Sequence, residues 1–261
     1  MENEWVFIAF LSDISERKKT EEALIRKEAE LLRIKLLEEK KDEFISIASH
    51  ELKTPLTTIK AYTQLAISLA DECTPAITQY LQKVDQYAGK VNYLINELLD
   101  VSRIQGGKLR LSEAEVTIET FLPEVLTSMQ HITQTHTITL NKIEKAKVKV
   151  DTIRLEQVIT NLISNAAKYS PGKDKIIVNS VKKDNSIVIS FTDFGIGIPK
   201  EKISKIFDRF YRVDEVSKEF SGLGIGLFIS SEIIKQHDGK IWAESVEGEG
   251  STFYISLPVI N

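Results

Sequence analysis

The feature that most constrains the fold is a long amphipathic stretch that almost lacks helix breakers. Between residues 13 and 71 the chain has no glycine and one proline, Pro55. Apolar residues recur there mostly at spacings of three, four or seven, with a break near residues 38–41. This pattern is typical of a coiled-coil-like seam, so we predict a long helix for most of the stretch.

A second amphipathic helix is predicted over residues 77–101, where apolar residues keep a spacing of three to four. Gly106 and Gly107 then stop this helix, and a short loop around residues 73–75 joins the two helices into a hairpin. Each apolar stripe is longer than one other helix can cover. We therefore expect two copies of the hairpin to form a homodimeric four-helix bundle.

The composition is that of a folded protein of about two domains. Of the 261 residues, 42% are hydrophobic and 28% are charged. A net charge of -4 argues against a nucleic-acid partner, which requires a basic surface. The single cysteine, Cys73, rules out an internal disulfide framework and fits a reducing compartment. We therefore expect a cytoplasmic chain, although the full-length protein could be anchored to a membrane upstream.

The apolar run Trp5–Leu11 is too short to cross a bilayer, which takes about 20 residues. It follows no basic segment and precedes no small-residue cleavage site, so it is not a signal peptide. Its aromatic and β-branched residues predict a single β-strand instead. We expect no membrane segment in this chain, and we interpret the strand as the end of a domain that begins upstream.

From Lys108 onward, short strands alternate with helices, which are predicted near residues 120–134, 152–169 and 224–237. Mixed strands with helices that cover one face predict an α+β two-layer sandwich, whose boundary with the hairpin we place at Gly106–Gly107. The strands are predicted at residues 115–118, 136–141, 147–151, 175–181, 186–193, 240–246 and 251–258.

The predicted helix at 152–169 carries four polar residues on one face. Asn161, Asn165, Lys168 and Tyr169 fall at positions i, i+4, i+7 and i+8. Asparagine is a poor helix former, so two asparagines one turn apart need a reason. The face is either an ordinary solvent face, or it presents two carboxamides to a metal–phosphate group beside an ammonium and a phenol. The residues alone leave both interpretations open.

Two glycine-rich segments are candidates for anion binding. SFTDFGIGIP ends a strand at Asp193 and continues with Gly195 and Gly197, and SGLGIGL at residues 221–227 opens a helix. Glycines allow close backbone approach, and N–H groups at a helix N-terminus bind anions. The spacing fits neither the dinucleotide motif nor the P-loop. Asp-Phe-Gly also occurs in eukaryotic-type protein kinases, but their other motifs are missing here.

Between the glycine segments, IFDRFYRVDE interleaves aromatic residues with Arg209 and Arg212. This pattern fits either amphipathic packing beneath a loop or a mobile lid whose arginine reaches a terminal phosphate. The residues do not decide between these two interpretations.

The segment IASHELKTPLTTI places a His50–Glu51 pair within the first long helix. Thr54 lies four residues after His50 and shares its helical face, whereas Glu51 is turned about 100° away. Pro55 lacks an N–H group, so we expect weakened helical hydrogen bonding within one turn of it. A zinc site is disfavoured, because the H-E-x-x-H motif would need histidine where Thr54 stands.

Five ordered motifs together resemble the catalytic core of a sensor histidine kinase of two-component signalling. SHELKTPL resembles the H-box of that family, NLISNAAKYS its N-box, DFGIGIP its first glycine box, FDRFYR its F-box and GLGIGL its second glycine box. The resemblance implies a dimerisation and histidine-phosphotransfer hairpin at 41–106 and a GHKL (Bergerat) ATP-binding domain at 107–261. The junction DISERKKTEEAL resembles the exit from a PAS sensor domain. Residues 1–12 would then be the last strand of a truncated PAS-like domain, and 13–40 its signalling coiled-coil helix.

The resemblance also implies an activity, which is ATP-dependent phosphorylation of His50. Glu51 would polarise the imidazole or take its proton, and Arg212 would stabilise charge on the γ-phosphate. Thr54 would position water for dephosphorylating a partner regulator. No receiver domain follows, so the next acceptor is expected to be an aspartate of a separate response regulator.

ATP and Mg²⁺ are the cofactors that the resemblance implies, with Asn165 and Asn161 as metal ligands. Related ATPases carry a glutamate base at the position of Asn161, so its absence favours transfer to a protein over hydrolysis. Leu223 replaces a threonine that is frequent in the family. The implied nucleotide contacts are Asn161, Asn165, Lys168, Tyr169, Asp193, Gly195, Gly197, Phe207, Gly222, Leu223, Gly224 and Gly226. A GHKL-type ATPase, or an ATP-binding dimeric scaffold without histidine phosphotransfer, is the alternative.

Overall fold

The structure, a computed structural model, describes residues 2–68, 75–213 and 223–260. The chain divides into two compact units, Met1–His50 and Glu51–Asn261. All the strands of the described residues, and the candidate site, belong to the second unit. The domain boundary expected at residues 106–107 lies inside this second unit and stays a prediction.

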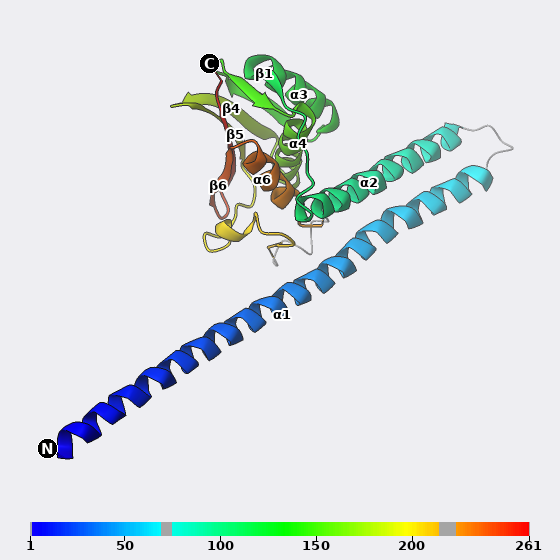
Figure 1. The fold of residues 1–261 in the computed structure, drawn as a ribbon. Helices are drawn as coiled ribbons and strands as arrows, with labels where there is room; N and C mark the ends of the chain where they lie inside the picture. The colour runs from blue at the N-terminus through cyan, green and yellow to red at the C-terminus, as the bar shows by residue number, and fades with distance from the viewer. Residues whose placement is uncertain (1, 69–74, 214–222, 261) are drawn as a thin grey trace. The chain divides into compact units, whose positions relative to one another are not determined.

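Helix α1 runs without interruption over Glu2–Ser68 (Figure 1). The strand predicted for Trp5–Leu11 is therefore wrong, because these residues are helical. A strand needs a neighbouring strand for its backbone hydrogen bonds, whereas a helix satisfies its backbone groups within the segment. The assignment of residues 1–12 to the end of a PAS-like domain depended on that strand and loses its support.

The helix also continues through Pro55, so the proline does not end it. The weakened hydrogen bonding expected within one turn of Pro55 stays a prediction. Two threonine hydroxyls that follow the proline bond to carbonyl groups that precede it. Thr57 Oγ1 donates to Lys53 O at 2.9 Å, and Thr58 Oγ1 donates to Thr54 O at 3.0 Å. Proline lacks the N–H group that would donate within this turn, and the two hydroxyls supply further donors to its carbonyl groups.

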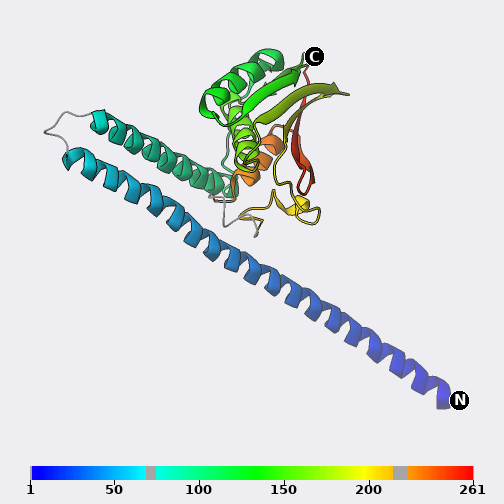
Figure 2. The ribbon, with the colours of Figure 1, turned by 180° about the vertical axis from the view of Figure 1, so that it is seen from behind.

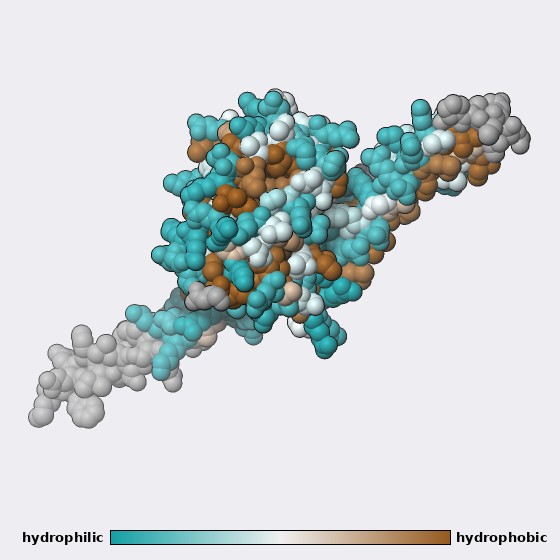
Figure 3. All heavy atoms as spheres, turned by 90° about the horizontal axis from the view of Figure 1, so that it is seen from above, coloured by the Kyte–Doolittle hydropathy of each residue, from teal (hydrophilic) through white to brown (hydrophobic). Residues whose placement is uncertain are grey.

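Helix α2 spans Pro75–Gln105 and confirms the second predicted helix. It ends where expected, because Gly107 adopts a left-handed φ of 60° and donates its N–H to Ile104 O at 3.1 Å. Tyr62 of α1 and Tyr80 of α2 lie side by side, with ring centroids 5.8 Å apart. The predicted connecting loop lies mostly outside the described residues. Hydrophobic side chains gather along one side of the hairpin (Figure 3).

The rest of the second unit is the predicted two-layer sandwich. A five-stranded sheet has the order β2-β4-β5-β7-β6, with only the β2–β4 pair parallel, and β1 pairs separately with β3. Helices α3, α4 and α6 cover one face of the large sheet (Figures 1 and 2). The strands are β1 Ala114–Thr117, β2 Thr137–Lys142, β3 Lys147–Val150, β4 Lys175–Lys183, β5 Ser186–Asp193, β6 Lys240–Val246 and β7 Gly250–Pro258. The helices are α3 Ile118–Ile132, α4 Thr152–Lys168 and α6 Gly226–Gln236, with a short 3-10 turn, η2, at Ile203–Lys205.

The core of the sandwich lies between the sheet and its helices. Buried and partly exposed residues alternate along β4 and β5, as expected for strands with one covered face. Helix α4 begins at the N-cap residue Asp151, whose Oδ1 accepts from Arg154 N at 3.1 Å. Its apolar stripe is buried against the sheet through Leu155, Val158, Ile159, Leu162, Ile163 and Ala166. Among the described residues, no helix combines the length and apolar character needed to cross a membrane.

Candidate functional site

A cavity of about 310 Å³ brings together most of the residues that the sequence singled out. Its walls come from α4, the end of β5, the start of α6, the segment around Arg212 and the helical hairpin. The predicted residues in its lining are Glu51, Asn161, Asn165, Lys168, Tyr169, Asp193, Gly197, Arg212, Leu223, Gly224 and Gly226. The polar face of α4 therefore borders a cavity and not only open solvent.

The two asparagines of α4 have different surroundings. Asn161 Nδ2 donates to Ser230 Oγ of α6 at 2.9 Å, and its Oδ1 accepts from Asn165 Nδ2 at 3.4 Å. Helix α6 approaches closely at Gly226, where an added Cβ would lie 2.5 Å from Asn161 Oδ1. Asn161 thus connects α4 to α6, whereas the side chain of Asn165 bonds to Asn161 within α4.

The donor set fits a hard cation that is shared with phosphate oxygens. Carboxamide oxygens suit Mg²⁺, which usually takes one or two protein ligands and completes its shell with phosphates and water. Within the described residues, no cluster of three or more His, Cys, Asp or Glu side chains could hold a metal ion. Asn165 is the better placed of the two predicted ligands, because the carboxamide of Asn161 is engaged at both ends.

A cation and a phenol stand together at the C-terminal end of α4. Lys168 Nζ donates to Tyr169 Oη at 3.0 Å and lies 4.6 Å from the centre of that ring. Both side chains line the cavity. An ammonium in this position can neutralise part of the charge of a bound phosphate chain.

Asp193 ends strand β5 with a carboxylate that is buried in the cavity wall. Its Oδ1 accepts from Gly195 N at 2.9 Å, which leaves acceptor capacity on the carboxylate. Burial raises the pKa of Asp193 above its ordinary value, and the N–H groups of Gly195 and Ser251 oppose that rise. A buried acceptor of this kind suits the amino group of a planar base.

The first glycine segment is fixed by close backbone contacts. A Cβ on Gly195 would lie 2.0 Å from Tyr169 O, so only glycine fits beside the end of α4. Ile196 N donates to the same carbonyl at 3.1 Å. Gly195 itself is outside the cavity lining, and it acts by letting the strand end and the helix end meet.

The second glycine segment and Arg212 lie against one another. Gly224 has a left-handed φ of 69°, and a Cβ there would lie 2.7 Å from Arg212 Cγ. Both residues line the cavity, together with Leu223. Arg212 therefore lies in the cavity wall, and its contact with a terminal phosphate stays a prediction. Gly222 lies outside the described residues.

The phenylalanines of the FDRFYR segment pack rather than line the cavity. The Phe207 ring meets Phe253 edge to face with centroids 6.5 Å apart, and Phe253 lies in the cavity wall. The Arg209 guanidinium sits 4.6 Å from the centre of the Phe210 ring. Phe207 therefore contacts a residue of the wall, and its predicted contact with the nucleotide stays a prediction.

Sequence reasoning missed the part of the wall that α2 supplies. Lys90, Tyr93, Leu94 and Glu97 line the cavity from this helix. Tyr93 Oη donates to Glu97 Oε1 at 2.9 Å. Burial raises the pKa of Glu97 to about 7, Asp100 adds to that rise, and the Tyr93 hydrogen bond and Lys168 oppose it. The spacing of these residues put them on one helical face, but nothing in the sequence indicated what that face would meet.

The acceptor motif lies on α1, as predicted. His50 is helical, although its side chain is outside what the structure describes. Thr54 is exposed, and its carbonyl accepts from Thr58 Oγ1. Since the helix is continuous here, His50 and Thr54 occupy i and i+4 positions on one face. Glu51, the residue after His50, belongs to the cavity lining.

Comparisons with known proteins agree with this geometry. Residues 40–107 match the His Kinase A (phospho-acceptor) domain, and residues 150–261 match the family of histidine kinase-, DNA gyrase B- and HSP90-like ATPases. The sensor protein kinase WalK of Staphylococcus saprophyticus is 33% identical over 258 residues, which cover 97% of this chain and 39% of that protein. The sensor histidine kinase WalK of Bacillus subtilis is 32% identical over 227 residues, which cover 85% of this chain and 37% of that protein. The chain thus spans less than half the length of these two relatives.

Two solved structures share the fold. The Acinetobacter baumannii histidine kinase AdeS superposes with a TM-score of 0.57 at 24% identity, over 81% of this chain and 98% of that one. Full-length ShkA in complex with AMPPNP superposes with a TM-score of 0.60 at 21% identity, over 84% of this chain and 46% of that one. At these identities the likeness concerns the fold.

Proposed function

Because the chain belongs to the sensor histidine kinases, we propose that it is an ATP-dependent protein-histidine kinase that phosphorylates His50. One observation carries the proposal above all. The ATP cavity contains Glu51, the residue that follows the acceptor histidine, together with the asparagine, lysine and arginine groups suited to phosphates. The groups suited to phosphates and the acceptor histidine thus occur in one chain.

The chain's residues act mainly by positioning. Phosphoryl transfer depends on alignment and charge neutralisation more than on covalent help from the protein. Asp193 accepts from the adenine amino group, Lys168 lies beside the phosphates, and Arg212 stabilises charge that develops on the γ-phosphoryl group. Asn165, and less directly Asn161, would hold Mg²⁺, which neutralises phosphate charge when bound.

The proposed step transfers the γ-phosphoryl group of ATP to a ring nitrogen of His50. A neutral imidazole nitrogen of His50 attacks the γ-phosphorus, the bond from that phosphorus to the bridging oxygen of ADP breaks, and a nitrogen–phosphorus bond forms. Imidazole is largely neutral near pH 7, because its usual pKa is about 6.5. The ring proton leaves to a base, and Glu51 is the candidate for that base.

The proposal extends to the partners of the chain. A homodimer through the hairpin would cover exposed apolar residues of α1 and α2, among them Leu56, Leu65, Leu81, Ile95 and Leu99. The phosphoryl group would then pass to an aspartate of a separate response regulator. Thr54, one turn beyond His50 and exposed, is placed to orient water for a phosphatase reaction on that regulator. Cytoplasmic location remains a prediction.

The test is labelling of the full chain with Mg²⁺ and γ-labelled ATP, beside His50→Ala and the control His131→Ala. His131 is an exposed histidine of α3, so its loss should leave labelling unchanged. We expect an acid-labile, base-stable label that disappears only in His50→Ala.

The other outcomes identify the alternatives. Label on serine would contradict histidine transfer. Free phosphate without protein label would show a GHKL-type ATPase, and neither product would show an ATP-binding scaffold. Transfer from labelled protein to a purified receiver domain tests the second half of the proposal.

A further inference from the structure

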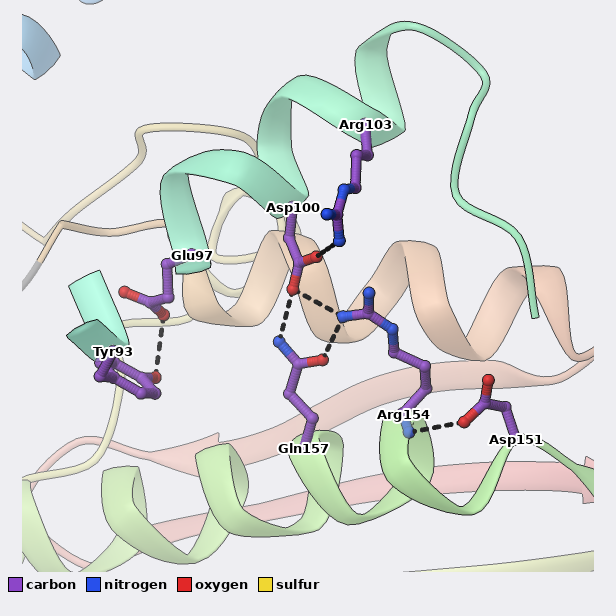
Figure 4. Close-up of polar contacts among 7 residues, drawn as sticks. All are labelled: Tyr93, Glu97, Asp100, Arg103, Asp151, Arg154 and Gln157. Atoms are coloured by element: carbon purple, nitrogen blue, oxygen red, sulfur yellow. Dashed lines mark hydrogen bonds and ion pairs between the residues drawn. The ribbon is translucent and has the colours of Figure 1, made fainter. Parts of the chain in front are cut away.

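A buried polar cluster joins the C-terminal end of α2 to the start of α4 (Figure 4). The Asp100 carboxylate, on a residue only 4% exposed, accepts through Oδ2 from Arg154 Nη1 at 2.7 Å and from Gln157 Nε2 at 2.9 Å. Arg154 Nη1 also donates to Gln157 Oε1 at 2.8 Å, so the three side chains form a closed triangle. None of these residues is needed for the nucleotide chemistry described above.

The start of α4, on the other side of this cluster, is held by contacts that do not involve α2. Asp151 caps α4 by accepting from Arg154 N, and its Oδ2 accepts from Ser112 N at 2.8 Å. The N–H of Asp151 donates to His237 Nε2 at 2.9 Å, which ties the start of α4 to the end of α6. Arg154 therefore projects from a fixed helix end toward α2.

The hairpin side of the cluster continues the face of α2 that lines the cavity. Lys90, Tyr93, Leu94 and Glu97 occupy i, i+3, i+4 and i+7 positions, and Asp100 follows three residues later on the same side. A contact at Asp100 thus fixes the rotation and height of the helix face one to three turns away.

We propose that Asp100 is a docking residue, whose carboxylate binds Arg154 and Gln157 and thereby makes α2 one wall of the nucleotide cavity. Docking and nucleotide binding are then coupled, because the bound nucleotide meets a wall that exists only in the docked arrangement. The consequence for phosphoryl transfer rests on the proposed kinase function, whereas the docking contact itself does not.

The buried ion pair of this cluster selects one docked position of the ATP-binding domain more than it adds stability. A buried ion pair gains little net stability, because both charges lose water, yet removing one partner leaves an uncompensated buried charge. A docked arrangement that buries Asp100 avoids that cost only when Arg154 pairs with it. The contact therefore discriminates against other positions of the ATP-binding domain along α2.

Arg103 provides a matched control. It also approaches Asp100, but at 3.8 Å and with 56% of its side chain exposed, so solvent screens it. It lies on the hairpin, so it cannot connect the hairpin to α4. Arg103→Ala should leave docking unchanged, whereas Asp100→Ala should loosen it.

The experiment measures hydrogen exchange in the full chain for wild type, Asp100→Ala, Arg103→Ala, Asp100→Arg, Arg154→Asp and the double charge exchange. We expect Asp100→Ala and both single reversals to raise amide exchange along residues 90–105 by about tenfold or more, as loss of one partner of a buried pair would. The double exchange should restore protection, at least in part. Asp100 variants alter only the hairpin, so they report on docking even if an Arg154 variant unfolds its domain.

A second readout separates docking from kinase activity. The ATP affinity should fall in both Asp100→Ala and Asp100→Arg. It should recover when Asp100→Arg is combined with Arg154→Asp, whether or not the protein transfers phosphate. If the chain labels His50, Asp100→Ala should also slow the first turnover at saturating ATP. Unchanged exchange and unchanged ATP affinity in Asp100→Ala would overturn the proposal, and so would a double exchange that is no better than its worse single variant.

Discussion

The ATP-binding domain and the helical hairpin solve the burial of apolar surface differently. In the ATP-binding domain, Ile118, Leu122, Ile159 and Ile189 are fully buried between one sheet and its helices. In the hairpin, residues at comparable helical positions stay open, with Leu81 53% exposed and Leu99 47% exposed. A helix pair has too little surface to enclose a core, whereas a sheet covered by three helices encloses one.

The two regions therefore obtain their stability from different contacts. The ATP-binding domain carries its own core, so its fold depends on residues of one chain. The hairpin depends on what covers it, which is the ATP-binding domain at Asp100 and, in the proposed dimer, a second hairpin along its apolar stripe. Substitutions in the two regions should therefore change different measured quantities.

The largest expected effect is on the core of the ATP-binding domain. Ile159→Ala empties a fully buried site in α4 and should lower the free energy of unfolding by about 2–5 kcal/mol. Ile153, also in α4, is 76% exposed, so Ile153→Ala should lower the free energy of unfolding by less than about 0.5 kcal/mol. Urea unfolding followed by circular dichroism measures both. Equal losses in the two variants would contradict the burial described for α4.

The next effect is on ATP affinity, and it compares a glycine of the ATP-binding domain with a glycine of the hairpin. Gly195→Ala forces a Cβ against Tyr169 O, so the end of α4 must move and ATP affinity should fall by about 100-fold, or about 2.7 kcal/mol. Gly89→Ala in the middle of α2 meets no atom within 4 Å. It should leave ATP affinity unchanged and raise helix stability by up to about 1 kcal/mol. Titration with a fluorescent ATP analogue compares them, and equal losses would show that the close approach at Gly195 is unimportant.

These regions also differ in how much their sequences predicted. The strands predicted at 175–181 and 186–193 and the helix predicted at 152–169 are confirmed as β4, β5 and α4. Their apolar residues are buried in a core that belongs to one domain. The run Trp5–Leu11 has the composition of a strand, yet it lies in α1. Composition alone does not supply the neighbouring strand that such a segment needs.

The candidate site divides in the same way. That Asn165, Asp193 and Gly224 lie at one site was predictable from the order of the motifs, and all three line the cavity. Tyr93 and Glu97 were not, since their role comes from the contact of α2 with a distant part of the chain. Phe207 was assigned to the nucleotide but packs on Phe253, a distinction that depends on side-chain direction and not on spacing.

The third effect concerns the exposed stripe of the hairpin. Leu81→Ala removes apolar surface that a second copy would cover, so it should weaken dimerisation by about 2 kcal/mol. Ile132→Ala, 76% exposed on α3, removes similar surface from the other region and should not change dimerisation. Sedimentation equilibrium measures both dissociation constants. A wild-type chain that stays monomeric at high concentration would contradict the proposed bundle.

The last effect is a pH dependence at the boundary between the two regions. Burial raises the pKa of Glu97 to about 7, so the folded state binds a proton that the unfolded state has already released. The charges around it are Asp100 and Lys90 on α2, Lys168 on α4, Glu51 on α1 and Arg212. Because the folded pKa is the higher one, this contribution favours folding at low pH and is lost as pH rises toward 7.

The measurement compares wild type with Glu97→Gln and with the exposed control Glu156→Gln by urea unfolding from pH 5 to 8. Up to about 1.4 kcal/mol per pH unit should be lost in wild type as pH rises from about 5 to about 7, with a plateau above that. Glu156→Gln should keep this slope, whereas Glu97→Gln should remove it, because an amide cannot take up the proton. Equal slopes in all three proteins would mean that Glu97 is not buried against the ATP-binding domain in solution. Helix α2 would then not form a wall of the cavity in solution. The apolar stripe of the hairpin would be covered by the second copy alone.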